Sequence, residues 1–283
     1  MMKVDIILVP YDSGYRGVRT GLGPIRLLEH GVDESLRRLG HQVDVQTIES
    51  AAGLTTEIGT TFELIRELAG AVHSSVSDGA LPIVLAGNCN SCVGTVAGSG
   101  GGDLGILWFD AHGDLNTPEI TESGFLDGMG LAMATGRCWK AILATIPGFI
   151  PISDAHIVHV GSRALDPAEE RMLGQSDIQL IPAQGSDAAG IQESVAAALR
   201  ELRNRVSRIY VHVDVDVLDT GEARPNHLAV PGGLSSSAVK ESITMAKELF
   251  ELSAFAIASF DPAYDYRDAV LQESIALVEA AVA

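Results

Sequence analysis

The sequence predicts an α/β protein, specifically a three-layer α/β/α sandwich with a mainly parallel central sheet. Short runs rich in Val, Ile and Leu alternate with stretches in which apolar residues recur at helical spacing, and this alternation is typical of a parallel sheet covered on both faces. We expect strands at 4–9, 42–48, 81–86, 104–109, 155–161, 208–215 and 254–260. We expect helices within 23–40, 61–79, 190–207 and 236–252, the last opened by the capping run "LSSS".

Length and composition indicate one domain over residues 1–283. The chain has 283 residues, of which 46% are hydrophobic, so it can bury a large core. It contains no linker, internal repeat or low-complexity tract. The region 113–153, rich in Gly, Thr, Ser and Pro, is expected to be the longest irregular connection, and long loops in compact domains are usually functional.

Charge and hydropathy exclude several classes of protein. A net charge of −18 argues against nucleic-acid binding, because no basic stripe faces phosphates. No apolar run reaches the roughly 18 residues of a membrane span, and the start, "MMKVDIILVPYD", is better explained as a first strand than as a signal peptide. Three cysteines without a disulfide spacing pattern indicate a reduced, cytoplasmic protein.

Two expected strands end in acidic clusters. Asp110, His112 and Asp114 follow the run 104–109, Asp214 lies near the end of the run 208–215, and Asp216 follows it. The carboxyl ends of parallel strands meet at one edge, where ligands bind, so these side chains should lie together. Turn formation explains single Asp residues but not such a set, and clustered carboxylates repel unless a cation or proton lies between them. Asp with His suits Mn, Fe, Co or Zn, and a carboxylate-dominated set favours Mn.

The acidic clusters belong to a wider resemblance. "WFDAHGDLNTP" (108–118) and "HVDVDVLD" (212–219) resemble the signature motifs of the arginase/agmatinase (ureohydrolase) family. Shorter matches extend the resemblance over nearly the whole chain, namely "RTGLGP", "HVGSRALDPAE", "PGGLS" and "DPAYD". The resemblance implies an arginase-like fold, hydrolysis of guanidino compounds to urea, and a homotrimer or homohexamer.

The resemblance also implies two Mn²⁺ ions per chain and assigns their ligands. Asp110 and Asp214 would bridge the two ions. His112 and Asp216 would complete one site, and Asp114 would belong to the other. Two such ions could lie about 3.5–4 Å apart and hold a hydroxide between them.

The first departure from the family pattern concerns the sixth ligand. The family has Gly-Asp-His where this chain has Gly87-Asn88-Cys89, so Cys89 occupies the position of a ligand His. A thiolate suits Zn, Fe or Co and is softer than Mn prefers. The residues leave three alternatives open: Cys89 is a ligand, or a small residue without a ligand role, or a redox partner of Cys92, which is expected in the following helix. Cys138 and two strand histidines, His159 and His212, are expected to be structural.

The second departure concerns proton transfer. The family has a shuttle His at the position of Asp127, and a carboxyl group can replace it only if its pKa is raised into the working range. The surrounding loop keeps the family pattern: Asn116, Thr121 and Ser123 resemble residues that hold the α-carboxylate of arginine, and Asp166 resembles one near the α-amino group. The alternative for these four residues is a polar loop of turn formers.

The third departure concerns the guanidinium. The family has a Glu at the position of Ser259, and a buried guanidinium without a carboxylate partner is costly. Asp261 lies two residues further on and would share the same face if the strand continued. Alternatively, the substrate is less basic, such as an N-hydroxyguanidine that binds as a neutral molecule.

The sequence therefore predicts a binuclear-metal hydrolase that cleaves a C–N bond of a linear guanidino amino acid and releases urea or hydroxyurea. Asp114 would relay the proton of the attacking hydroxide to the leaving amine, and Asp127 would exchange protons with solvent. An N-hydroxyarginine-type substrate is preferred over arginine, as in some bacterial relatives. The alternatives are a formimino or amidine hydrolase on the same scaffold, and a metal-stabilised binding protein without turnover.

Overall fold

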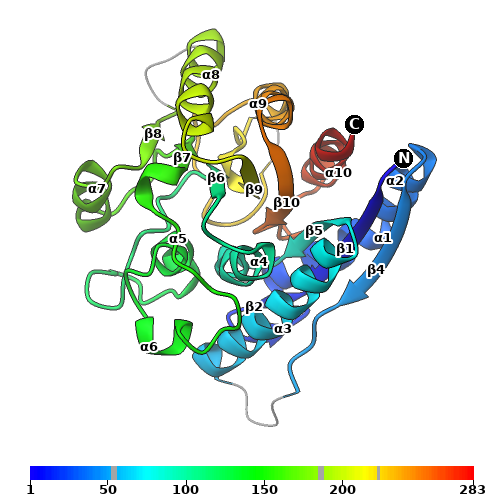
Figure 1. Ribbon diagram of the computed structural model, residues 1–283, viewed down its shortest axis with the longest axis horizontal. Helices are drawn as coiled ribbons and strands as arrows, with labels where there is room; N and C mark the ends of the chain where they lie inside the picture. The colour runs from blue at the N-terminus through cyan, green and yellow to red at the C-terminus, as the bar shows by residue number, and fades with distance from the viewer. Residues whose placement is uncertain (52–55, 184–187, 222–223) are drawn as a thin grey trace.

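The structure is a computed structural model that describes residues 1–51, 56–183, 188–221 and 224–283 (Figure 1). Within these residues the main sheet has eight strands, and every neighbouring pair is parallel. The strand order across the sheet is β4 (Gln42–Thr47), β1 (Lys3–Val9), β5 (Ala80–Ala86), β10 (Glu251–Ala258), β9 (Arg208–Asp214), β6 (Leu104–Phe109), β7 (Ile157–Val160) and β8 (Gln179–Ile181). A short hairpin, β2 (Tyr11–Asp12) and β3 (Tyr15–Arg16), follows β1. The predicted parallel sheet is confirmed.

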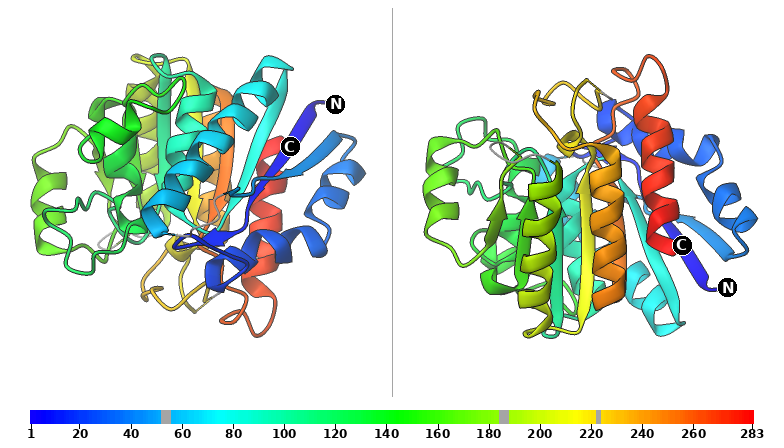
Figure 2. Two further views of the ribbon diagram at one scale, coloured as in Figure 1. Left: turned by 90° about the horizontal axis from the view of Figure 1, so that it is seen from below. Right: turned by 90° about the horizontal axis from the view of Figure 1, so that it is seen from above.

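Helices cover both faces of the sheet and complete the three layers. One face carries α1 (Gly23–Glu29), α2 (Val32–Arg38), α8 (Ala188–Arg203), α9 (Ser236–Leu249) and α10 (Ala269–Val282). The other carries α3 (Glu57–Ser77), α4 (Cys92–Ser99), α5 (Gly130–Ala134), α6 (Lys140–Leu143) and α7 (Pro167–Gly174). The two views of Figure 2 show these faces in turn. Among the described residues, no helix combines the length and apolar character that crossing a membrane requires.

The hydrophobic core is divided by the sheet into two clusters because successive side chains of a strand point to opposite faces. In β1, Ile6 belongs to the cluster that contains Leu36 of α2, and Ile7 belongs to the cluster that contains Ile65 of α3. All four side chains are almost fully buried. Burying one such side chain stabilises the fold by roughly 1.5–3 kcal/mol, so both layers of helices are held to the sheet along its whole length.

The seven expected strands are all present, and the differences have local causes. The expected strand 254–260 ends at Ala258, because Ser259 has a left-handed backbone with φ +67°. The expected helix 23–40 is two helices, because Gly31 has φ +77° and breaks the helical path. The edge strand β8 has three residues, too few for a recognisable pattern.

The region 113–153 is a long connection between β6 and β7, as expected, but short helical segments interrupt it. It contains a 3₁₀ turn at Asp127–Met129 followed by α5 and α6. The chain folds back on itself, since Ala132 N donates to Asp114 O at 2.9 Å and Asn116 N donates to Gly128 O at 3.1 Å. These backbone bonds bring the segment after β6 against the 3₁₀ turn that starts at Asp127.

The packing of α4 on α3 requires glycine at position 98. A Cβ atom there would lie 2.5 Å from Val72 Cβ and 2.6 Å from Ala69 O. Gly98→Ala is therefore expected to lower the free energy of unfolding by about 1–3 kcal/mol. In the matched control Gly70→Ala, the new Cβ meets nothing within 4 Å, and helix propensity should raise stability by up to about 1 kcal/mol. Urea unfolding measures both, and equal effects would contradict the packing argument.

Candidate functional site

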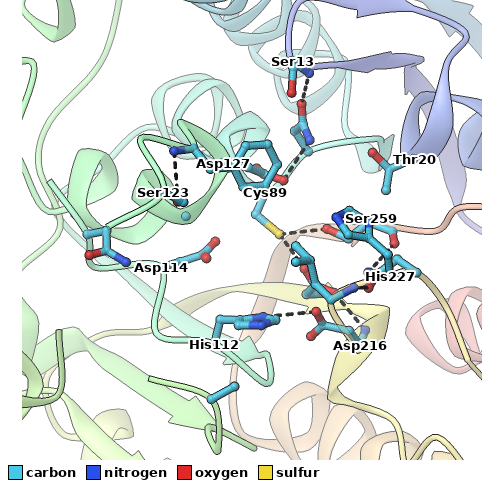
Figure 3. Close-up of a pocket in the computed structure, with 18 of the residues that line it drawn as sticks. Ser13, Thr20, Cys89, His112, Asp114, Ser123, Asp127, Asp216, His227 and Ser259 are labelled. Atoms are coloured by element: carbon cyan, nitrogen blue, oxygen red, sulfur yellow. Dashed lines mark hydrogen bonds and ion pairs between the residues drawn. The ribbon is translucent and has the colours of Figure 1, made fainter. Parts of the chain in front are cut away.

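Four adjacent central strands deliver side chains to one edge of the sheet. Cys89 follows β5, Ser259 follows β10, Asp214 ends β9 and Asp110 follows β6. All four strands are parallel, so their carboxyl ends lie together, as expected for a ligand site in such a sheet. Figure 3 shows the side chains of Cys89, His112 and Ser259 around one shared pocket.

Five residues with metal-binding atoms form two overlapping groups. Cys89, Asp110 and Asp214 make one group, and Asp110, His112 and Asp216 make the other. Within each group the ligand atoms lie within 4.8 Å of one another, and Asp110 belongs to both. Asp110 is held in place by Trp108, whose Nε1 donates to Oδ2 at 3.0 Å. Asp114 lies outside both groups but lines the same pocket.

The carboxylates of the site are buried with little compensation by the protein. Burial raises the pKa of Asp110 to about 6 and raises the pKa values of Asp114 and Asp214, with neighbouring carboxylates adding to the shift. Asp114 Oδ2 is buried and has no hydrogen-bond partner among the described residues. A cluster of this kind is costly unless a cation or protons neutralise it.

His112 supplies part of that neutralisation when it is protonated. Its Nδ1 lies 3.4 Å from Asp110 Oδ1 and 3.1 Å from Asp216 Oδ2. Burial opposes the imidazolium, but these two carboxylates outweigh it and raise the pKa of His112 to about 12. Burial would likewise raise the pKa of Asp216, but His112 keeps it low. The donor set and its unbalanced negative charge therefore fit divalent cations.

Cys89 faces this centre, whereas Cys92 does not. The Cys89 thiol donates to Asp214 Oδ2 at 3.0 Å and lies 3.4 Å from Ser259 Oγ. Burial, followed by the charge of Asp214, raises the pKa of this thiol, so a thiolate would need a cation beside it. Cys92 begins α4, as expected, and its thiol donates to Gly130 O at 3.3 Å. Separate partners for the two thiols do not favour a redox pair.

The pocket in front of these residues has a volume of about 740 Å³. It is lined by most of the residues expected to bind substrate or protons, namely Asn116, Ser123, Asp127, Asp166 and Ser259. Thr121 does not line it, and its Oγ1 lies behind Ser123 Oγ at 3.5 Å.

Asp261 is also absent from the pocket wall, and the strand ends before it, so the condition under which Asp261 would share the face of Ser259 is not met. The left-handed backbone of Ser259 ends the strand and is fixed by Asn226, whose Nδ2 donates to Ser259 O at 2.9 Å. Asp261 accepts a hydrogen bond from Ala263 N at 3.0 Å instead. The alternation of side chains along β10 therefore cannot place Asp261 beside Ser259.

Asp166 and Glu169 connect the pocket to α7. Asp166 is the N-cap of α7 and accepts a hydrogen bond from Asn116 Nδ2 at 3.0 Å. Glu169 completes the capping box, and its Oε1 accepts from Leu115 N at 2.8 Å. Burial raises the pKa of Glu169 to about 7. The sequence analysis missed Glu169, although the pattern Asp166-Pro-Ala-Glu169 is a helix-start signal that could have located it.

The sequence analysis also missed the wall of the pocket opposite α7. Asp12, Arg19 and Asn88 line it, and Arg19 Nε donates to Asp12 Oδ2 at 2.5 Å. Burial would raise the pKa of Asp12, but the hydrogen bond from Arg19 outweighs it and lowers the pKa. Arg19 lies within "RTGLGP" and has φ +45°, a strained backbone for a residue other than glycine. The proximity of Asp12 and Asn88 could not be predicted from their spacing in the sequence, because it arises from the pairing of β1 with β5.

Comparisons with known proteins identify the family. The family model described as the arginase family matches residues 2–282. The chain is 29% identical to an arginase of Bacillus caldovelox, over 98% of this chain and 97% of that protein. It is 27% identical to an arginase of Staphylococcus aureus strain MRSA252, over 97% and 95%. The solved structure of Bacillus caldovelox arginase at pH 5.6 has a TM-score of 0.90, covering 99% of this chain and 98% of that chain.

The fold and its buried cluster of acidic side chains are those of a metal-dependent hydrolase. The chain belongs to the arginase family and is a hydrolase of that family. Membership implies a binuclear site for divalent metal ions, and the two ligand groups that share Asp110 are consistent with such a site.

Protons and metal ions should compete for this site. In the metal-free protein His112, with a pKa of about 12, is protonated at neutral pH, and Asp110, with a pKa of about 6, takes up a proton in mild acid. The affinity for Mn²⁺ should therefore rise from about pH 6 to about pH 8, with protons released on binding. Calorimetric titration of chelator-treated protein in two buffers of different ionisation enthalpy measures this release. An affinity independent of pH would contradict it.

Proposed function

We propose that this protein hydrolyses a C–N bond of a linear guanidino amino acid and releases urea or hydroxyurea. The observation that carries the proposal is the convergence of Asp110, Asp214, Asp216 and His112 at the carboxyl ends of adjacent strands in a member of the arginase family. A pocket of about 740 Å³ in front of these residues has room for an amino acid of the size of arginine.

Two divalent cations, Mn²⁺ in the first instance, would be held by Cys89, Asp110, His112, Asp114, Asp214 and Asp216. When bound, such cations polarise the guanidino carbon and provide hydroxide from water at neutral pH. The carboxylates dominate this set, which supports Mn²⁺, while the Cys89 thiol would make one position softer than the rest. Trp108 keeps the Asp110 carboxylate oriented through its indole N–H.

Asp114 is the proton relay of the proposed reaction. Its Oδ2 is buried and makes no hydrogen bond in the described part of the chain, so it can accept a proton from the attacking water. Burial raises the pKa of Asp114, which makes its carboxylate a better base than an exposed one. The same oxygen can then donate the proton to the leaving nitrogen.

Asp127 is proposed to exchange protons between the site and solvent. Its carboxyl lines the pocket, and burial raises its pKa to about 7, so both protonation states are populated near neutral pH. A raised pKa of this kind supports Asp127 in the role of an acid–base group, which requires a pKa in the working range.

The substrate class follows from the two ends of the pocket. Asn116 and Ser123 line one end and would bind an α-carboxylate, with Asp166 near the α-amino group. At the other end Ser259 offers a hydroxyl, and Asp261 does not line the pocket. A buried guanidinium without a carboxylate partner is costly, and Ser259 offers only a hydroxyl. This supports a substrate with a less basic guanidino group, so N-hydroxyarginine is preferred over arginine.

The test is release of urea or hydroxyurea from arginine, N-hydroxyarginine, agmatine and guanidinobutyrate by Mn-loaded protein, with metal content counted in parallel. Hydroxyurea from N-hydroxyarginine, with two ions per chain, is the expected result. If the protein released formamide from a formimino compound and no urea from these four compounds, it would be a formimino hydrolase. Two bound ions with no product from any of these compounds would overturn the hydrolase proposal in favour of a binding protein.

Asp110→Asn and Asp214→Asn should each abolish product release and reduce the metal content below two ions per chain. Each change keeps the size of the side chain and removes the charge that would hold a cation. Asp44→Asn, at an exposed position on β4, is the matched control and should keep both ions and full activity. Wild-type turnover in either site variant would refute the metal assignment.

Asp127→Asn should lower kcat by about 10²–10⁴-fold, the usual contribution of a positioned acid–base group. Because the ionised form of Asp127 accepts the proton, the wild-type rate should rise with pH through about 7, and this limb should be missing in Asp127→Asn. A pH–rate profile over both proteins measures the limb. An unchanged profile in the variant would remove Asp127 from the proton path.

The assembly and location of the chain remain predictions. Resemblance to the family supports a homotrimer or homohexamer in the cytoplasm, with residues 1–283 acting as one domain. Light scattering coupled to size-exclusion chromatography would measure the mass of the assembly against the 29.7 kDa of one chain.

A further inference from the structure

Two departures from the family pattern, far apart in the sequence, are in contact in the structure. Asn88 replaces the Asp of Gly-Asp-His, and Asp127 replaces the shuttle His. The two side chains are hydrogen-bonded, since Asn88 Nδ2 donates to Asp127 Oδ2 at 2.8 Å. Both are at least nine-tenths buried. Asn90 supports the same carboxylate through its backbone N–H, which donates to Asp127 Oδ1 at 3.1 Å.

The orientation of the Asn88 amide is fixed by its surroundings. Its Oδ1 accepts a hydrogen bond from Ser13 N at 2.9 Å, so the oxygen must face the loop between β2 and β3. Its Nδ2 then faces three acceptors: Asp127 Oδ2, Gly87 O at 3.2 Å, and Asp12 Oδ1 at 3.5 Å. A carboxylate at position 88 would keep the contact with Ser13 but would have no proton for these oxygens.

Asp12, the acidic neighbour of Asn88 in the pocket wall, is also held by hydrogen bonds. Asp12 accepts hydrogen bonds from Arg19 Nε and, at 2.9 Å, from Ser13 Oγ. Asp12 therefore stays ionised, as its lowered pKa also indicates, and a second acid beside it would be repelled. The amide of Asn88 is thus the donor that allows two acidic side chains, Asp12 and Asp127, to face the same space.

We propose that Asn88 is the positioning residue for Asp127: it holds the Asp127 carboxyl at the pocket wall by donating to Oδ2, and it is required because Asp127 is an acceptor. The proposal rests on the proposed function, in which Asp127 transfers protons. It adds a residue that acts through the Asp127 carboxyl, and it treats the replacements at positions 88 and 127 as one coupled change.

The experiment is a double-mutant cycle on Mn-loaded protein with Asn88→Asp, Asp127→His and the combined variant, assayed on the substrate found with the panel above. Asn88→Asp places two carboxylates at hydrogen-bond distance and should lower kcat by about 10–100-fold, with KM changed less than about 3-fold. In the combined variant the His that replaces Asp127 can donate a hydrogen bond to the Asp that replaces Asn88, so the donor and acceptor roles are exchanged. This variant should recover most of the lost kcat. Asn204→Asp, at an exposed position, is the matched control and should behave as wild type.

Readouts other than rate separate positioning from a merely structural role. Metal content and urea-unfolding midpoints should be similar in all variants that fold. The rise of the rate with pH through about 7, expected for the wild type, should be displaced or lost in Asn88→Asp. If Asn88→Asp does not fold, Asn88→Ala removes the same hydrogen bond without adding charge and should show the same loss of kcat.

Two results overturn the proposal. One is that the wild-type protein is active and neither Asn88→Asp nor Asn88→Ala changes its kcat or its pH–rate profile. The other is a combined variant whose kcat loss is simply the product of the two single losses. A wild-type protein that binds two ions but releases no product overturns the proposed function instead, and the positioning role with it.

Discussion

The mutual repulsion of buried carboxylates at the carboxyl edge of a parallel sheet is the constraint on which the rest of the site depends. Four neighbouring strands end within reach of one another, and their acids are buried side by side, with Asp114 Oδ2 lacking a hydrogen-bond partner among the described residues. Asp110, Asp114 and Asp214 have raised pKa values for this reason. Such a cluster is stable when positive charge or protons neutralise it. The same negative charge that destabilises the empty cluster therefore favours the binding of cations and protons.

Positive and donor groups are placed around the cluster accordingly. His112 lies between Asp110 and Asp216, Arg19 neutralises Asp12 at the opposite wall, and Asn88 donates to Asp127. The acids in this arrangement have different surroundings and different pKa values: burial raises the pKa of Asp110 to about 6 although His112 lies beside it, whereas His112 keeps the pKa of Asp216 low. That separation allows ionised ligands and a proton carrier with a pKa near neutrality to exist within one pocket of about 740 Å³.

Three substitutions in the family pattern affect different parts of the site. By resemblance to the family motifs, Cys89 stands at the position of a ligand His, Ser259 at the position of a Glu, and Asp127 at the position of the shuttle His. The first two lie 3.4 Å apart at their side-chain tips, and the third is bonded to Asn88, the neighbour of Cys89 in the chain. The altered positions are therefore contiguous in space.

The sequence by itself determined seven strands of the main sheet, the three-layer arrangement and the acidic clusters. Hydrophobic periodicity and short motifs such as Asp110-Ala-His112-Gly-Asp114 are local in the chain, so they can be read without a structure. The tertiary structure alone decided what depends on distant segments or on backbone conformation. Asn88 meets Asp127 because the chain after β6 folds back, and Asp261 leaves the pocket because Ser259 turns the strand end. Contacts of this kind have no sequence period, since they arise from how the elements pack.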